Sequence, residues 1–484
     1  MSFTEPSFFL FLLIVCTGYY LIPKAAQWVW LLAASLGFYL LACPSGFWYL
    51  LVSAFFVYSC GLLLPRLHGG WKKFVLAAAL SVVLLVLLWW KYSGFLAGVA
   101  FSWGIEGLPS FSGIALSLGI SFYTLQLIGY CVDVFRGSAL PERNPAKFLL
   151  FVSFFPQILQ GPIPRFQQLA GQLSLPHPFQ WGQVRAGVQL MVWGCFQKLV
   201  IADRAGILVN FVYEHYRDLD GFRILLGILF YSFQLYTDFS GCVDIARGAS
   251  QMLGIELAEN FRQPYLARSV ADFWKRWHIS LSSWFRDYLY IPLGGNRRGK
   301  IRKYGNVIFV FLVSGLWHGA GIHFLVWGLL HGLYQAMGEI LLPVRKLWLR
   351  LTAANSDCFS RHLCQSVCTF LLVSLAWVFF RAESLTQAWD MLYAMVTLWS
   401  PWVFFDGSFL QLGLGAWDFA LCLLGFGLII TVDLLHQKYH LREALARQNV
   451  SFQFLVTAGG ILAILLLGIY GPGYSSAGFI YAAF

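Results

Sequence analysis

Two histidines near the middle of this 484-residue chain, His278 and His318, carry the side chain best suited to moving protons near neutral pH. An imidazole titrates at about pH 6.5, so it can accept a proton from a hydroxyl group and release it again. Each follows a tryptophan, Trp277 or Trp317, within largely apolar sequence. An ionisable side chain at bilayer depth is costly and marks a functional site. The two histidines are therefore our first candidates for chemistry.

Asp238 is a further ionisable residue in apolar sequence, since it lies in the run 230–239. A bare carboxylate there needs an ion pair or a proton. We expect Asp238 to form a structural ion pair rather than to orient a catalytic group, with Arg276, Arg286 or one of the histidines as its partner.

Membrane helices must position these side chains, because 59% of the chain is hydrophobic and only 11% is charged, against about 25% charged in soluble proteins. Apolar runs recur from Phe8–Ile22 to Phe452–Gly468. From the length of a spanning helix we predict about eleven to thirteen membrane segments, all helical because lipid cannot satisfy backbone polar groups. The expected fold is an all-α polytopic membrane protein, one transmembrane domain over 1–484, with re-entrant and interfacial amphipathic helices around a central tunnel.

The segment Arg268–Ile291 differs from the apolar runs around it. Ser269 followed by Asp272 approximates a capping box, and aromatic residues recur at helical spacing after it. The pattern predicts an amphipathic helix with His278 at the edge of its apolar stripe. His318, in turn, lies among the glycines of residues 304–342, where a broken helix would expose it to a cavity.

The charge of the chain is uneven. The formal net charge is +11, and residues 262–303 hold ten Lys or Arg against two acids. Aromatic residues interleave with these cations, so contact with anionic lipid on the cytoplasmic leaflet explains them better than nucleic acid does. The phosphates of an acidic donor such as coenzyme A could share this surface. The acidic leader with Glu5 predicts an N-terminus outside the cytoplasm.

The ten cysteines indicate neither a disulfide framework nor a metal site. Cys358, His362, Cys364 and Cys368 form the one cluster, and it lacks the close cysteine pairs of zinc sites. We expect buried thiols that act as small hydrophobic side chains.

The sequence resembles the membrane-bound O-acyltransferase superfamily, in its bacterial branch of polysaccharide O-acetyltransferases typified by the alginate acetylation protein. The resemblance is specific over residues 119–332. It rests on Gly119-ISFYTLQLIGY-Cys131, on Tyr236-TDFSG-Cys242, on Asp272-FWKRWHISLSSWFRDYLYIPLGGN-Arg297, on Gly315-LWHG-Ala320 and on Trp327-GLLH-Gly332.

The resemblance implies roles for individual residues. His318 would be the catalytic residue and His278 a second site residue that orients His318 or the acceptor. For His331 a structural hydrogen bond between helices is the expected role. The remaining residues expected to support the site are Asp238, Asn260, Trp274, Arg276, Ser280, Arg286, Asp287 and Trp317. Trp274, Trp277 and Trp284 either line a tunnel or anchor the chain at the membrane interface.

The resemblance also implies a function. The expected reaction is transfer of an acyl group, most simply acetyl, from a cytoplasmic thioester donor such as acetyl-CoA to a hydroxyl of an extracytoplasmic polysaccharide. It implies a multi-pass protein of the bacterial inner membrane, a periplasmic acetyltransferase partner or modification complex, and no bound cofactor. Two alternatives stay open: D-alanyl or other acyl transfer to a cell-wall polymer, and a transporter or channel whose histidines relay protons.

Overall fold

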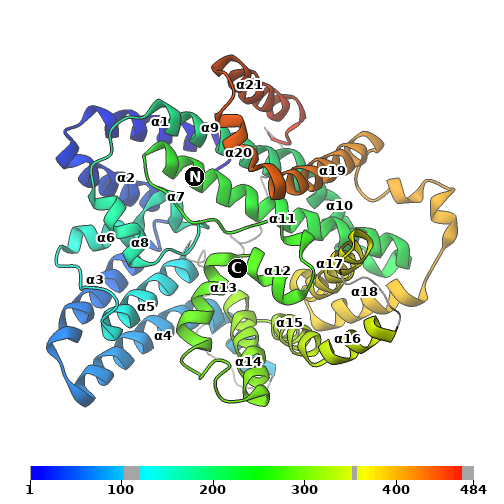
Figure 1. The fold of residues 1–484 in the computed structure, drawn as a ribbon, viewed down its shortest axis with the longest axis horizontal. Helices are drawn as coiled ribbons and strands as arrows, with labels where there is room; N and C mark the ends of the chain where they lie inside the picture. The colour runs from blue at the N-terminus through cyan, green and yellow to red at the C-terminus, as the bar shows by residue number, and fades with distance from the viewer. Residues whose placement is uncertain (1, 103–118, 352–356, 471–484) are drawn as a thin grey trace. The chain divides into compact units, whose positions relative to one another are not determined.

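The computed structural model describes residues 2–102, 119–351 and 357–470 (Figure 1). All regular structure in these ranges is helical, which confirms the all-α prediction. The described residues form two compact units, each assembled from separate stretches of chain. One contains residues 2–194 and 242–259, and the other contains 195–241 and 260–470. A single domain over 1–484 stays a prediction.

The first unit is a set of packed helices in which α3 contacts α5 and α6, and α2 contacts α6. Its helices are α1 (Pro6–Leu21), α2 (Gln27–Ala42), α3 (Phe47–Leu63), α4 (Gly69–Ser102), α5 (Ile120–Arg136), α6 (Pro145–Ser153), α7 (Phe155–Ile158), α8 (Phe166–Ser174) and α9 (Trp181–Cys195, whose last residue passes into the second unit). Local sequence explains the start of α6, where Pro145 takes the first turn and Asn144 accepts hydrogen bonds from the Ala146 and Lys147 amides.

The second unit carries every residue that we predicted for the site. Its elements are the π-helical segment η3 (Phe196–Ala202), α10 (Asp203–Glu214), α11 (Gly221–Met252, which ends in the first unit), α12 (Val270–Arg276), α13 (Ile279–Phe285), the π-helical segment η6 (Arg286–Tyr290), α14 (Lys300–His318), α15 (Ile322–Ile340), α16 (Leu342–Leu351), α17 (Phe359–Arg381), α18 (Leu385–Thr397), α19 (Ala416–Tyr439), α20 (Leu441–Ala446) and α21 (Val450–Leu467).

Six helices of the described chain are long and apolar enough to cross a membrane, and a bent pair brings the number to seven. They are Lys24–Ala42, Phe47–Arg66, Gly69–Phe95, Phe359–Arg381, Ala416–Tyr439 and Val450–Leu467, with Ile322–Ile340 and Leu342–Leu351 as the pair bent by 46°. This is fewer than the predicted eleven to thirteen segments. Several apolar runs form short helices instead, among them 148–159, which divides into α6 and α7.

The hairpin of α14 and α15 is the closest helix pair of the second unit, and Figure 1 shows the two helices side by side with α17 next to α15. Glycines allow this approach. A Cβ on Gly315 would lie 2.3 Å from the Phe324 carbonyl oxygen, and a Cβ on Gly328 would lie 2.3 Å from that of Phe311. The hairpin therefore brings backbone against backbone, and it holds His318 at its tip.

Candidate active site

His318 is the last residue of α14, and the chain turns into extended backbone at Gly319. The predicted helix break is therefore confirmed. The side chain is buried, with 2% of the residue exposed. Aromatic rings enclose the imidazole, with ring centroids of Trp317, Trp327 and Phe380 at 4.8, 5.0 and 5.1 Å. Such an enclosure excludes water and leaves a base in a medium of low polarity.

His278 occupies a break between two short helices. The continuous amphipathic helix predicted over Arg268–Ile291 is wrong, because α12 ends at Arg276 and α13 begins at Ile279. The start is as predicted, with Ser269 accepting a hydrogen bond from the Asp272 amide. At the break, His278 adopts the left-handed conformation, with φ of 45°. Non-glycine residues rarely take this conformation, and it is found at functional sites.

The surroundings of His278 keep its imidazole neutral. Burial lowers the pKa of His278 from 6.5 to about 3. The Phe239 ring meets the imidazole edge-on at 4.8 Å, and the Trp317 ring lies 6.3 Å away. Since Trp317 also contacts His318 at 4.8 Å, its indole links the two histidines. The structure thus brings together three predicted residues, His278, Trp317 and His318.

Asn260 holds the break in place from a separate segment of the chain. Its backbone carbonyl accepts from the Ile279 amide at 3.0 Å, and its side-chain Oδ1 accepts from the Ser280 amide at 2.9 Å. These two amides open α13 and have no partner within the helix. Asn260 therefore fixes the residues that follow His278, and its contribution to the site stays a prediction.

Asp238 forms a buried ion pair with Lys198, whose Nζ lies 2.5 Å from its carboxylate. Lys198 also contacts Asp203 at 2.8 Å, and all three side chains are at most 3% exposed. Burial opposes the charge on Lys198, but Asp238 and Asp203 more than offset it and raise the pKa of the amine. An ion pair at Asp238 was predicted, but Lys198 was not predicted as its partner. Lys198 ends the apolar run 184–200, so the reasoning applied to Asp238 also applies to it.

The arginines that we expected to pair with Asp238 pair elsewhere. Arg276 Nε binds Asp272 at 3.1 Å, one helical turn earlier in α12. Arg286 Nε binds its neighbour Asp287 at 2.8 Å, and 63% of the Arg286 side chain is exposed. Neither arginine that we considered as a candidate partner therefore pairs with Asp238.

His331 and Trp274 form the hydrogen bond between helices that we expected of His331. Trp274 Nε1 on α12 donates to His331 Nδ1 on α15 at 3.2 Å. Trp327, one turn before His331, contacts both His331 and His318. Trp277 is fully buried, so it does not anchor the chain at an interface. Sequence reasoning missed Trp327 and Trp377, which are buried in the same cluster.

The cysteine cluster on α17 is not as predicted. Cys364 and Cys368 are exposed rather than buried, and Cys358 is half-buried. They begin an apolar helix whose outer side carries other exposed apolar residues. No group of His, Cys, Asp or Glu that could hold a metal ion occurs within the described ranges.

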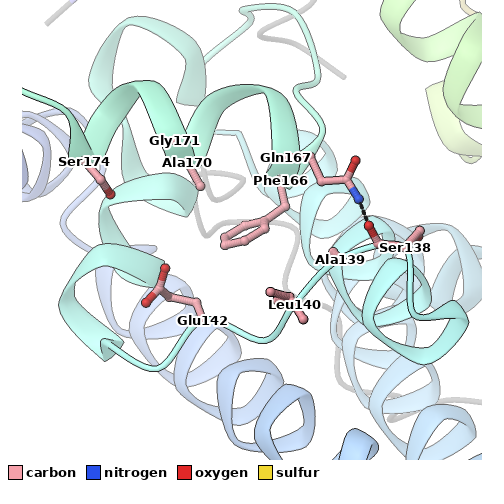
Figure 2. Close-up of a pocket in the computed structure, with 9 residues that line it drawn as sticks. All are labelled: Ser138, Ala139, Leu140, Glu142, Phe166, Gln167, Ala170, Gly171 and Ser174. Atoms are coloured by element: carbon pink, nitrogen blue, oxygen red, sulfur yellow. Dashed lines mark hydrogen bonds between the residues drawn. The ribbon is translucent and has the colours of Figure 1, made fainter.

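A separate pocket of about 310 Å³ lies in the first unit (Figure 2). Helix α8 and the segment 138–142 form it, and the Phe166 ring points into it while Gln167 donates to the Ser138 carbonyl. Glu142 is its one ionisable lining residue. It contains none of the predicted site residues and no histidine, so the buried histidines remain the better candidate for chemistry.

The fold and the site together define a polytopic α-helical membrane protein with a buried pair of histidines. The family model described as MBOAT, membrane-bound O-acyltransferase family, matches residues 139–382, about half of the chain. The chain belongs to this family. The matched region includes both histidines, Asn260, Lys198 and the α14–α15 hairpin.

Named relatives fall into three groups. The probable alginate O-acetylase AlgI of Pseudomonas syringae pv. tomato is 38% identical over 65% of this chain and 59% of its own length. The peptidoglycan O-acetyltransferase of Helicobacter pylori is 34% identical over 82% of this chain and 80% of its own. The teichoic acid D-alanyltransferase of Streptococcus thermophilus is 32% identical over 47% of this chain and 58% of its own. The chain spans 56% to 65% of the lengths of three AlgI relatives that it matches.

Proposed function

We propose that this protein is an O-acyltransferase that moves an acetyl group from a cytoplasmic thioester, most simply acetyl-CoA, to a hydroxyl of an extracytoplasmic polysaccharide. The observation that carries the proposal is the buried pair of histidines on either side of Trp317, in a chain of the membrane-bound O-acyltransferase family. Family membership and the absence of an internal repeat in the sequence argue against the transporter alternative.

In the proposed reaction His318 acts as the general base. Its imidazole takes the proton of the acceptor hydroxyl while the hydroxyl oxygen attacks the thioester carbonyl carbon. The carbon–sulfur bond then breaks, and the imidazolium returns the proton to the departing thiolate. The products are an ester and a free thiol, with no net change in protons. The aromatic rings around His318 keep water from taking the place of the acceptor.

His278 has a positioning role in this proposal. Its low pKa keeps it neutral across the physiological range, so it can accept or donate one hydrogen bond without adding charge. Asn260 fixes the backbone that follows it. This arrangement supports orientation of the acceptor or of His318 rather than a second proton transfer.

Acetyl transfer to a cell-envelope glycan is preferred over D-alanyl transfer. The relatives named as acetylating proteins are 34% to 39% identical, and one of them aligns over 82% of this chain, whereas the D-alanyltransferase aligns over 47%. The proposed acceptors are therefore alginate-type polysaccharide or peptidoglycan. A periplasmic partner that passes the acetyl group on, and residence in the inner membrane, are parts of the same proposal.

The test is transfer of radiolabelled acetyl from acetyl-CoA by the purified full chain in nanodiscs, with alginate oligosaccharides or peptidoglycan fragments as acceptors. His318→Gln should abolish transfer, while His323→Gln should not. His323 is a suitable control, because it lies on α15 and its Nδ1 pairs with the Phe379 carbonyl. Transfer that survives in a folded His318→Gln protein would exclude His318 as the base.

A further inference from the structure

Four N–H groups of aromatic rings in the core of the second unit have no hydrogen-bond acceptor among the described residues. They are Nε1 of Trp277, Trp327 and Trp377, and Nε2 of His331. None of the four residues is exposed to solvent. Buried polar groups in native proteins nearly always have partners, so each exception requires an explanation.

The four residues form one cluster, which we call the indole cluster. Trp377 lies at its centre, with ring centroids of Trp277, Trp327 and His331 at 5.3, 5.7 and 5.8 Å. The Trp327 and His331 rings are 5.1 Å apart. The residues come from three places in the chain: the α12–α13 break, α15 and α17. The packing of these elements therefore gathers these four aromatic residues in one region.

All four groups are donors. An indole has an N–H and no acceptor nitrogen. His331 Nδ1 accepts the hydrogen bond from Trp274, so in the neutral ring the proton resides on Nε2. The indole cluster thus offers hydrogen-bond donors and no acceptors, and the group that suits it carries acceptor atoms only.

The indole cluster also adjoins the proposed base. The Trp327 ring is 5.0 Å from the His318 ring, and Phe380 contacts both His318 and Trp377. A thioester at His318 has one strong acceptor, its carbonyl oxygen. The negative charge of an acyl-transfer intermediate gathers on that oxygen, where N–H donors stabilise it most.

We propose that the indole cluster receives the acyl end of the donor and that its indole N–H groups donate to the carbonyl oxygen of the thioester. This inference rests on the proposed acyl transfer and assigns a donor-binding role to the indoles of Trp277, Trp327 and Trp377. It accounts for the unpaired N–H groups, for the fact that all four are hydrogen-bond donors, and for their position beside His318.

The experiment compares Trp327→Phe and Trp377→Phe, which remove an unpaired N–H, with Trp274→Phe, which removes a paired one. We expect kcat/KM for acetyl transfer to fall by about tenfold or more in the first two variants. Their unfolding temperatures should fall less than that of Trp274→Phe, which leaves His331 Nδ1 without its donor. A purely structural role for the indoles predicts that Trp327→Phe and Trp377→Phe keep the wild-type kcat/KM wherever the protein is folded.

A binding measurement tests the contribution of the carbonyl oxygen alone to donor binding. Acetyl-CoA and S-ethyl-CoA differ in this oxygen, which the thioether lacks. Acetyl-CoA should raise the unfolding temperature of the wild-type protein more than S-ethyl-CoA does, and the difference should vanish in Trp327→Phe or Trp377→Phe. If both variants keep this difference and full activity, the inference is wrong while the proposed function stands. If the wild-type protein neither transfers acetyl nor responds to acetyl-CoA, both are wrong.

Discussion

His278 shows how a single residue combines backbone and side-chain requirements. Its φ of 45° lies in the left-handed region, which Asn tolerates far better than β-branched residues do. We expect His278→Asn to keep the unfolding free energy close to that of the wild type, while His278→Val loses about 1–3 kcal/mol. Both variants should lose acyl transfer. Unfolding in denaturant and the acetyl-transfer assay measure the two effects separately, and a stable His278→Val protein would contradict this account of the backbone.

Asn260 is expected to matter through one acceptor atom. Asn260→Ala removes the side-chain oxygen that accepts from the buried Ser280 amide, which costs about 1–3 kcal/mol. Asn260→Asp keeps an oxygen in the same place and, with its buried carboxyl group protonated, should lose less stability. Acyl transfer should follow the same order, since the Asn260 side chain fixes the residues after His278. Equal activities in the two variants would show that this hydrogen bond does not position the site.

The Lys198 cluster has one amine and two carboxylates, so its members are not equivalent. Lys198→Met removes the amine that contacts both buried carboxylates and should lose about 3–5 kcal/mol of stability. Asp203→Asn leaves a balanced Lys198–Asp238 pair and should lose clearly less. Chemical unfolding of both variants tests this order, which a cluster held together by packing alone would not show.

At this scale the sequence predicted which residue types matter better than it predicted their partners. His278, His318 and Asn260, which belong to the sequence motifs, are all buried in the second unit. Lys198 was not foreseen as the partner of Asp238, because the two residues are forty positions apart in sequence and nothing local connects them. Pairing across a fold depends on tertiary packing, which residue spacing along one segment does not contain.

At the scale of elements, periodicity was a good guide to where a helix begins and a poor guide to where it breaks. Aromatic residues recur at helical spacing across residues 273–288, and the pattern continues through His278 without interruption. The break depends on Asn260, which supplies acceptors to the first amides of α13 from outside the segment. A contact from elsewhere in the chain thus overrides a local pattern.

Helix α15 offers a matched pair of glycines to test the close packing of the hairpin. Gly328→Ala would place a Cβ 2.3 Å from the Phe311 carbonyl oxygen, whereas a Cβ on Gly338 meets nothing within 4 Å. We expect Gly328→Ala to lose several kcal/mol and all acyl transfer, as overpacking against backbone does. Gly338→Ala should be neutral or gain about 0.5–1 kcal/mol from helix propensity. Thermal unfolding of both variants is the measurement.

At the scale of the whole molecule, composition was enough to predict an all-helical membrane protein. The number of spans was not predictable in the same way, because an apolar run can form two short helices instead of one spanning helix. Residues 148–159 do so at α6 and α7, where Pro156 lies in the first turn of the second helix. Composition shows how apolar a run is. Whether the run crosses a membrane also depends on where the chain turns within it.

Acid should destabilise the whole protein through His278. Its pKa is about 3 in the folded state and 6.5 ordinarily, so between these values the unfolded chain binds more protons. Stability is therefore fully present above about pH 6.5 and falls as the pH drops toward 3. Comparison of wild-type and His278→Asn unfolding temperatures at pH 7.5 and about pH 5 measures this, and the wild type should lose more. Parallel losses would show that other groups dominate.

The glycine contacts between α14 and α15 also limit how the site can open. Gly315 and Gly328 each lie against a carbonyl oxygen of the opposite helix, so sliding either helix by one residue would drive a side chain into backbone. The hairpin therefore moves as one rigid body that carries His318. Gating motions must then occur in the elements facing it, the α12–α13 break and α17. The hairpin would then keep its internal arrangement while the site opens, and the elements that face it would move away from it.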